Sequence, residues 1–153
     1  MNKQALNYAT TRNNSGDDWS TPKHVTDKLI SLGYIDNDYF DPCPLNHDIN
    51  KWDGTKVDWG ETNFVNPPYS TKLKNAFVQK AVEESKKGKK VVLLIPAATS
   101  TILFHDWIYP NAKEILFVER RIKFGGKETS GMHDSMIVIL GEREEVKLGI
   151  FKQ

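Results

Sequence analysis

An uninterrupted apolar run, Val91-Val92-Leu93-Leu94-Ile95-Pro96, restricts the possible folds of this chain more than any other stretch. The run has the length of a strand, and it lacks the polar alternation of a strand with one face in water. Such runs are typical of parallel strands that helices bury on both faces. The run therefore predicts an α/β fold with this strand inside the sheet.

Segments of helical and strand character alternate along the rest of the chain, as α/β folds require. The pattern predicts a helix over residues 22–33 with Thr21 as its cap, Val25, Leu29 and Leu32 on its apolar face, and Gly33 at its end. The other expected elements are a short strand at 39–40, a strand ending at 65, a helix over 71–87, a short helix at 103–109, a strand at 114–118 and a terminal hairpin of 135–140 with 146–151.

This order predicts a three-layer α/β fold whose sheet is mostly parallel with antiparallel terminal strands. The chain has 153 residues, enough for one domain with a good core. We expect that domain to span residues 18–153. Residues 1–17 are polar with few apolar anchors, so we expect a loosely ordered leader there.

Composition excludes several classes of protein. Hydrophobic residues make up 39% and charged residues 27% of the chain, as in soluble globular proteins. No apolar run approaches the roughly 18 residues of a membrane span, and the N-terminus lacks the apolar region of a signal peptide. The single cysteine, Cys43, agrees with a reducing cytoplasm, the compartment that we expect.

The charge is distributed unevenly along the chain. Residues 1–70 hold 6 Lys and Arg against 10 Asp and Glu, and residues 71–153 hold 15 against 10. A positive second half suits a polyanion such as nucleic acid, although solvated helices are equally rich in lysine. The charge therefore permits a nucleic-acid partner without demanding one.

The tetrapeptide Asn66-Pro67-Pro68-Tyr69 directly follows the strand that we expect to end at Val65. Loops at the carboxyl ends of strands form the ligand sites of α/β folds. Two consecutive prolines stiffen this loop, which offers the Asn66 oxygen, the Pro67 carbonyl and an aromatic ring. A plain turn would use similar residues.

Asn-Pro-Pro-Tyr resembles the catalytic motif of amino-methyltransferases that use S-adenosylmethionine. The tetrapeptide and several other segments follow one another along residues 18–140 in an order that resembles that of small phage-type DNA N-6-adenine methyltransferases. The segments that carry the resemblance, besides the tetrapeptide, are Thr21-Pro22, Asp41-Pro42-Cys43, Leu94-Ile95-Pro96, Arg121-Ile122-Lys123-Phe124 and Asp134-Ser135-Met136-Ile137-Val138.

The resemblance implies a Rossmann-like methyltransferase domain without a separate target-recognition domain. It also implies direct methyl transfer to adenine N6 in DNA, on a flipped-out or single-stranded base. The oxygens of Asn66 and Pro67 would hold the amine hydrogens within the rigid turn completed by Pro68, and Tyr69 would stack on the base. The same motif also serves enzymes that methylate RNA or a glutamine amide in proteins, and a binding module without turnover is a further alternative.

The resemblance assigns S-adenosylmethionine to residues around the first two segments, namely Trp19, Ser20, Thr21, Pro22, Asp41, Pro42 and Cys43. The family usually has glycines after the Asp-Pro, whereas this chain has Pro44-Leu45-Asn46-His47. Either Asp53 or Asp58 could bind the ribose hydroxyls.

Three basic residues, Arg121, Lys123 and Lys127, follow the strand at 114–118, in a loop with two glycines. This loop could contact DNA phosphates, or Arg121 and Phe124 could simply pack against the sheet edge.

Cys43 follows Pro42, and cytosine-C5 methyltransferases use the cysteine of a Pro-Cys pair as a nucleophile. Their cysteine belongs to the target-base loop, which in this chain is Asn-Pro-Pro-Tyr, so we expect no cysteine nucleophile. Cys43 and His47 would be half of a zinc-binding set, and no second pair has suitable spacing. We expect no metal site.

Overall fold

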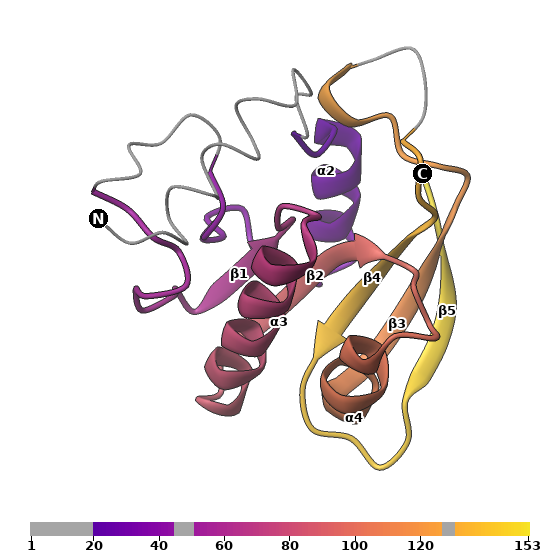
Figure 1. Ribbon diagram of the computed structural model, residues 1–153. Coiled ribbons are helices and arrows are strands. Elements are labelled where there is room, and N and C mark those ends of the chain that lie inside the picture. Colours follow the sequence, from indigo (N-terminus) through magenta and orange to yellow (C-terminus); the bar gives the residue numbers. More distant parts are fainter. Residues whose placement is uncertain (1–19, 45–50, 127–130) are drawn as a thin grey trace.

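The apolar run forms strand β2 (Lys90–Pro96), in which residues 91–95 are all buried. The computed structural model describes residues 20–44, 51–126 and 131–153. In these ranges β2 belongs to a five-stranded sheet of order β1-β2-β4-β3-β5 (Figure 1). The other strands are β1 (Thr62–Val65), β3 (Ala112–Glu119), β4 (Ser135–Leu140) and β5 (Lys147–Lys152). The α/β class and the buried strand are confirmed.

The sheet is mixed: β1, β2, β3 and β5 run in one direction and β4 runs opposite to them, so the prediction of antiparallel terminal strands was wrong. β2 is parallel to β1 and antiparallel to β4, while β3 is antiparallel to β4 and parallel to β5. The antiparallel strand β4 therefore lies in the middle of the sheet and not at its end. Two parallel and two antiparallel pairings connect the strands of the described ranges.

The predicted terminal hairpin was also wrong, because β3 lies between β4 and β5. The connection that crosses the end of β3 is held by Arg143, whose guanidinium donates to the carbonyls of Ala112 (2.6 Å) and Tyr109 (2.7 Å). The same guanidinium lies 5.3 Å from the centre of the Tyr109 ring. Arg143 thus anchors the chain so that β5 adds to the outer side of β3.

Helices cover both faces of the sheet. On one face, α3 (Thr71–Lys86) packs with the π-helical turn Phe104–Ile108 and α4 (Tyr109–Asn111). On the other face, α2 (Lys23–Ser31) packs on Phe64, Leu94 and Ile137. Figure 1 shows α3 and α4 in front of the strands, with α2 near one end of the sheet. Successive side chains of a strand point to opposite faces of the sheet. The odd-numbered buried residues of β2 therefore pack in the core on one face and the even-numbered ones in the core on the other.

The helix α2 begins at Lys23, one residue later than predicted, and no side chain caps it. Val25 and Leu29 are buried as expected, whereas Leu32 lies beyond the helix and is 53% exposed. The chain then turns at Gly33, where a φ of +78° favours glycine. The apolar stripe of α3 is confirmed by the burial of Leu73, Phe77, Val78, Ala81 and Val82.

Candidate active site

The Asp-Pro segment and the Asn-Pro-Pro-Tyr segment meet at one edge of the sheet. Phe40 forms a parallel bridge with Asn63 of β1, because its N–H donates to the Thr62 carbonyl (2.8 Å) and its carbonyl accepts from Phe64 N–H (3.0 Å). Asp41 and Asn66 follow these two parallel segments. They therefore emerge together at the carboxyl-end edge, where ligands of α/β proteins bind.

Asn66, Pro67 and Pro68 are buried at the end of β1, and Tyr69 is half-buried. The Asn66 side chain reaches across to the segment before α2, where its Nδ2 donates to Thr21 Oγ1 (3.1 Å). The hydroxyl of Thr21 therefore contacts the asparagine instead of capping the helix, which corrects the predicted cap. This hydrogen bond links the end of β1 to the segment before α2.

A cavity of about 390 Å³ lies between α2, Asp41 and the end of β1. Its volume falls within the range of small-molecule and cofactor sites. Of the predicted site residues, it brings together Ser20, Thr21, Asp41, Cys43 and Asn66. Pro22, Pro42, Pro67, Pro68 and Tyr69 are neighbours in the chain but do not line it, and Trp19 lies outside the described residues.

Five further residues line the cavity and were missed by sequence reasoning: Lys23, Thr26, Tyr39, Pro44 and Phe64. The signal for two of them was present, since Tyr39 and Phe64 each precede a predicted residue by two positions. Side chains two apart on an extended chain point to the same side. Lys23 and Thr26 occupy the first turn of α2, directly after Thr21 and Pro22.

The orientation of the Asp41 carboxylate and the protonation of the Tyr39 hydroxyl in the cavity follow from their surroundings. The Asp41 carboxylate accepts from the backbone N–H of Cys43 (2.7 Å), which fixes its orientation. Burial raises the pKa of Tyr39, the Asp41 charge raises it further, and a hydrogen bond with Thr26 opposes these effects. Tyr39 is therefore a neutral phenol beside a carboxylate, and its ring packs edge-on against Phe64 at 5.8 Å.

Tyr69 lies on the α2 face of the sheet, beside the loop that follows β3. Its ring makes edge contacts with Phe124 (6.2 Å) and His133 (6.1 Å). Phe124 begins a 3-10 turn, Phe124–Gly126, in which Gly125 N–H donates to the Ser20 carbonyl (3.1 Å). Tyr69, this turn and the segment before α2 are thus packed together at the same edge.

The basic loop is only partly available for a polyanion. Arg121 Nε donates to Asp134 Oδ1 (3.0 Å), so its charge has a partner. Ile122 and Phe124 are buried, in agreement with the packing alternative, whereas Lys123 between them is exposed. Lys127 lies outside the described residues.

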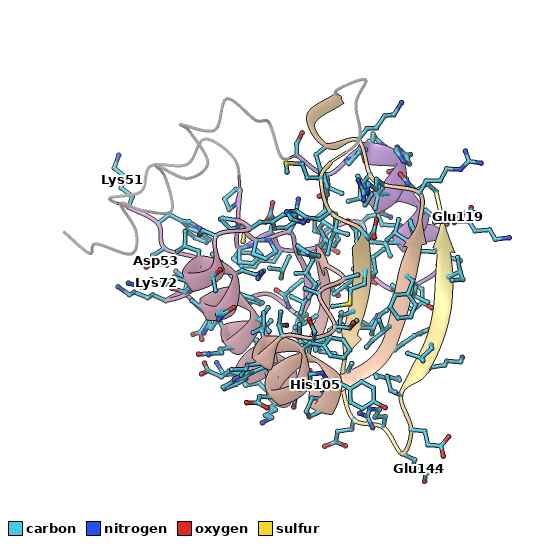
Figure 2. All side chains as sticks on the ribbon, turned by 45° about the vertical axis from the view of Figure 1, so that its right-hand side comes forward. Lys51, Asp53, Lys72, His105, Glu119 and Glu144 are labelled. Atoms are coloured by element: carbon cyan, nitrogen blue, oxygen red, sulfur yellow. The ribbon has the colours of Figure 1, made fainter. Side chains whose placement is uncertain are left out.

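The two candidate ribose-binding aspartates differ in position. Asp53 is 20% exposed, its Oδ1 accepts from Thr55 N–H (3.0 Å) and Thr55 Oγ1 (2.7 Å), and Figure 2 shows it at the end where α3 begins. Asp58 is 89% exposed and pairs with Lys87 (3.4 Å) beyond the carboxyl end of α3. Asp53 lies nearer the cavity, because Trp52 Nε1 donates to the Pro42 carbonyl (3.4 Å).

Gly54 makes a close backbone contact with Pro42 of the Asp-Pro segment. A Cβ on Gly54 would lie 1.9 Å from the Pro42 carbonyl oxygen. Only a glycine permits that distance. Residues 45–50, which include most of the glycine-free stretch, lie outside the described ranges.

Metal sites and membrane spans are both absent from residues 20–44, 51–126 and 131–153. No three His, Cys, Asp or Glu side chains there gather as a metal site would require. No helix there has the length and apolar character to cross a membrane.

Comparison with known proteins gives consistent results. Residues 8–148 match the DNA N-6-adenine-methyltransferase (Dam) family. A DNA N-6-adenine-methyltransferase of Haemophilus phage HP1 is 28% identical over 136 residues, which cover 81% of this chain and 75% of the relative. Another of Escherichia phage T1 is 31% identical over 114 residues, 66% of this chain but only 44% of the relative. No solved structure matches the chain.

Proposed function

We propose that this chain, which belongs to the DNA N-6-adenine-methyltransferase family, transfers a methyl group from S-adenosylmethionine to adenine N6 in DNA. The observation that carries the proposal is the position of Asn66. It combines a buried acceptor side chain, a rigid Pro-Pro turn and the rim of a cofactor-sized cavity at one sheet edge.

The residues of the cavity suit the amino-acid end of the cofactor. That end carries an ammonium and a carboxylate, and the cavity offers the Asp41 carboxylate for the first and the Ser20 and Thr21 hydroxyls for the second. Phe64 and Tyr39 add apolar walls. When bound, the cofactor supplies an electrophilic methyl group on sulfur. These contacts would hold it beside Asn66.

Asn66 and Pro67 would activate the target amine. The lone pair of adenine N6 is delocalised into the ring, so the amine is a poor nucleophile. Acceptors for its two hydrogens, the Asn66 side-chain oxygen and the Pro67 carbonyl, favour a pyramidal nitrogen. They bind more strongly as positive charge develops during transfer, which is the condition for catalysis. The proton can leave afterwards, so no strong base is needed.

Tyr69 would hold the base. Its ring is half-buried next to Phe124 and His133 and directly follows the acceptor loop. An adenine rotated out of its duplex, or one in a single strand, would stack there. Because both phage relatives carry the name of a DNA enzyme, we place the activity on DNA in the cytoplasm of a bacterial host.

Incubation with DNA and cofactor labelled in the methyl group tests the function. After digestion to nucleosides, the label should appear in N6-methyldeoxyadenosine, and an Asn66→Ala control should show almost none. Parallel incubations contain RNA or a glutamine-containing peptide. Label in those substrates but not in DNA would contradict the proposal, as would a failure to bind cofactor in titration calorimetry.

Asp53 is our candidate for the ribose hydroxyls of the cofactor. Its loop packs on Pro42 through Gly54, and its buried Oδ2 has no hydrogen-bond partner in the described ranges but forms an ion pair with the Lys56 ammonium at 3.6 Å. Asp53→Asn should weaken cofactor binding roughly tenfold, the loss of a charge-assisted hydrogen bond. Asp58→Asn is the matched control and should leave cofactor affinity unchanged. Equal effects of the two variants would reject the assignment.

A further inference from the structure

We propose that Thr21 is a positioning residue whose hydroxyl orients the Asn66 amide, so that the amide oxygen and not the amino group faces the reacting amine. The inference rests on the proposed function, in which Asn66 accepts a hydrogen from adenine. One hydrogen bond between residues 45 positions apart carries it: Asn66 Nδ2 donates to Thr21 Oγ1 at 3.1 Å.

An asparagine amide has two ends of similar size and opposite hydrogen-bonding character. Rotation by half a turn about its last bond would replace the acceptor with a donor. That donor would face the amine's own hydrogens, and activation would be lost. Only a neighbouring group can select between the two orientations. A hydroxyl can donate as well as accept, so it selects an orientation only when its own hydrogen is engaged elsewhere. In the proposed complex the Thr21 hydroxyl donates that hydrogen to the cofactor carboxylate. Its oxygen then accepts from the Asn66 amino group, which leaves Asn66 Oδ1 on the other side of the amide.

The surroundings make this contact rigid. Asn66 is only 8% exposed and precedes two buried prolines. On the other side, Thr21 precedes Pro22, whose φ of −58° is fixed by its ring, and follows Ser20, whose carbonyl accepts from Gly125 N–H (3.1 Å). Thr21 lies just before α2, yet no side chain caps this helix. The Thr21 hydroxyl instead accepts the hydrogen bond from Asn66.

Removing and restoring the hydroxyl tests the role. Thr21→Val keeps the shape and loses the oxygen, whereas Thr21→Ser keeps the oxygen and is the matched control. At saturating cofactor, kcat for adenine methylation should fall roughly tenfold to 100-fold in Thr21→Val, as for other misplaced catalytic groups. Thr21→Ser should keep most of the activity. If Thr21→Val melts early by circular dichroism, Thr21→Ala replaces it.

A second background separates orientation from other roles. Asn66→Asp presents two equivalent acceptor oxygens, so no orientation needs to be selected. Adding Thr21→Val to Asn66→Asp should then change kcat by less than about twofold, well below the loss in the natural background. The same loss in both backgrounds would overturn the inference. So would an unchanged kcat with a weaker equilibrium Kd for cofactor, which would make Thr21 only a cofactor contact.

The two proposals fail in different ways. If the natural enzyme forms no N6-methyladenine in DNA, the proposed function is wrong and this inference is wrong with it. If the natural enzyme is active and Thr21→Val keeps its kcat, the function stands and only the positioning role is rejected.

Discussion

Gly54 packs so closely on Pro42 that a Cβ would lie 1.9 Å from the proline carbonyl oxygen and 3.1 Å from the Phe77 ring. Residues 42 and 54 therefore share one close backbone approach. Because Pro42 lies between Asp41 and Cys43, which both line the cavity, a displaced Pro42 would move the cofactor site.

Gly54→Ala should therefore destabilise the fold and weaken cofactor binding together. Overpacking typically costs about 1–3 kcal/mol, and here the clash is with backbone. Urea unfolding and calorimetry with cofactor measure the two effects. Gly88→Ala is the control, because its position has a positive φ but open space around it. If both variants bind cofactor equally well, the packing on Pro42 does not shape the site.

Asn66→Ala should nearly abolish turnover and leave cofactor affinity close to that of the natural protein. The variant removes a preorganised acceptor at the reacting amine, and such a loss costs on the order of 100-fold or more in rate. Single-turnover methylation and calorimetry give the two quantities. Full activity in the variant would exclude Asn66 from the catalytic role.

Tyr69→Ala should weaken binding of the target base, whereas Tyr69→Phe should retain much of it. Stacking on an aromatic ring is worth about 1–3 kcal/mol per base and needs no hydroxyl. Binding of an oligonucleotide with 2-aminopurine at the target position, followed by fluorescence, measures base capture. Equal weakening in the two variants would assign the role to the hydroxyl.

The parts of the fold that could be predicted are those that local sequence determines. The burial of residues 91–95 and the apolar stripe of α3 follow from periodicity alone. The sheet order does not, because it depends on the connection before β5, which Arg143 holds through backbone carbonyls far from it in sequence. Turn length and strand pattern favoured a hairpin, and a tertiary interaction decided otherwise.

The candidate site also combines features that the sequence predicts with one that it does not. The tetrapeptide and the Asp-Pro pair could be found by motif, and strand ends place Asp41 and Asn66 at the same edge. The use of Thr21 could not be predicted, since a threonine before a helix is normally its cap. Whether its hydroxyl binds its own helix or Asn66 depends on how closely α2 and β1 approach, which no local pattern encodes.

Glu84 should make the protein sensitive to acid. Burial alone would raise the pKa of this fully buried carboxyl, but hydrogen bonds from Lys80, Lys87 and Lys89 outweigh burial and lower it to about 2. Because the folded-state pKa lies below the ordinary value of 4.5, the carboxylate stabilises the fold above pH 4.5. This contribution, on the order of 3 kcal/mol, disappears as the pH falls toward 2.

Glu84→Gln should consequently unfold at lower urea concentration at pH 7, and the gap to the natural protein should shrink as the pH falls below 4.5. Lys80 and Lys89 would remain largely buried without their carboxylate, which adds to the destabilisation at neutral pH. Glu83→Gln, the exposed neighbour on α3, is the control. A gap independent of pH would show that Glu84 acts by packing and not by charge.

Lys123 and Lys127 should bind DNA phosphates if the loop after β3 faces the nucleic acid. Replacing both with alanine should weaken binding to every sequence by a similar factor, since phosphates carry no sequence information. On duplex DNA, the slope of log K against log salt should flatten by roughly 0.9 for each phosphate that a lysine no longer neutralises.

Arg121 is left in place because it pairs with Asp134, and its replacement would disturb the loop itself. The control is the pair Lys86→Ala and Lys90→Ala, at the opposite end of α3 and β2 from the cavity, which should leave the slope unchanged. A flatter slope in the control and not in the loop variant would assign DNA binding to that other end of the sheet.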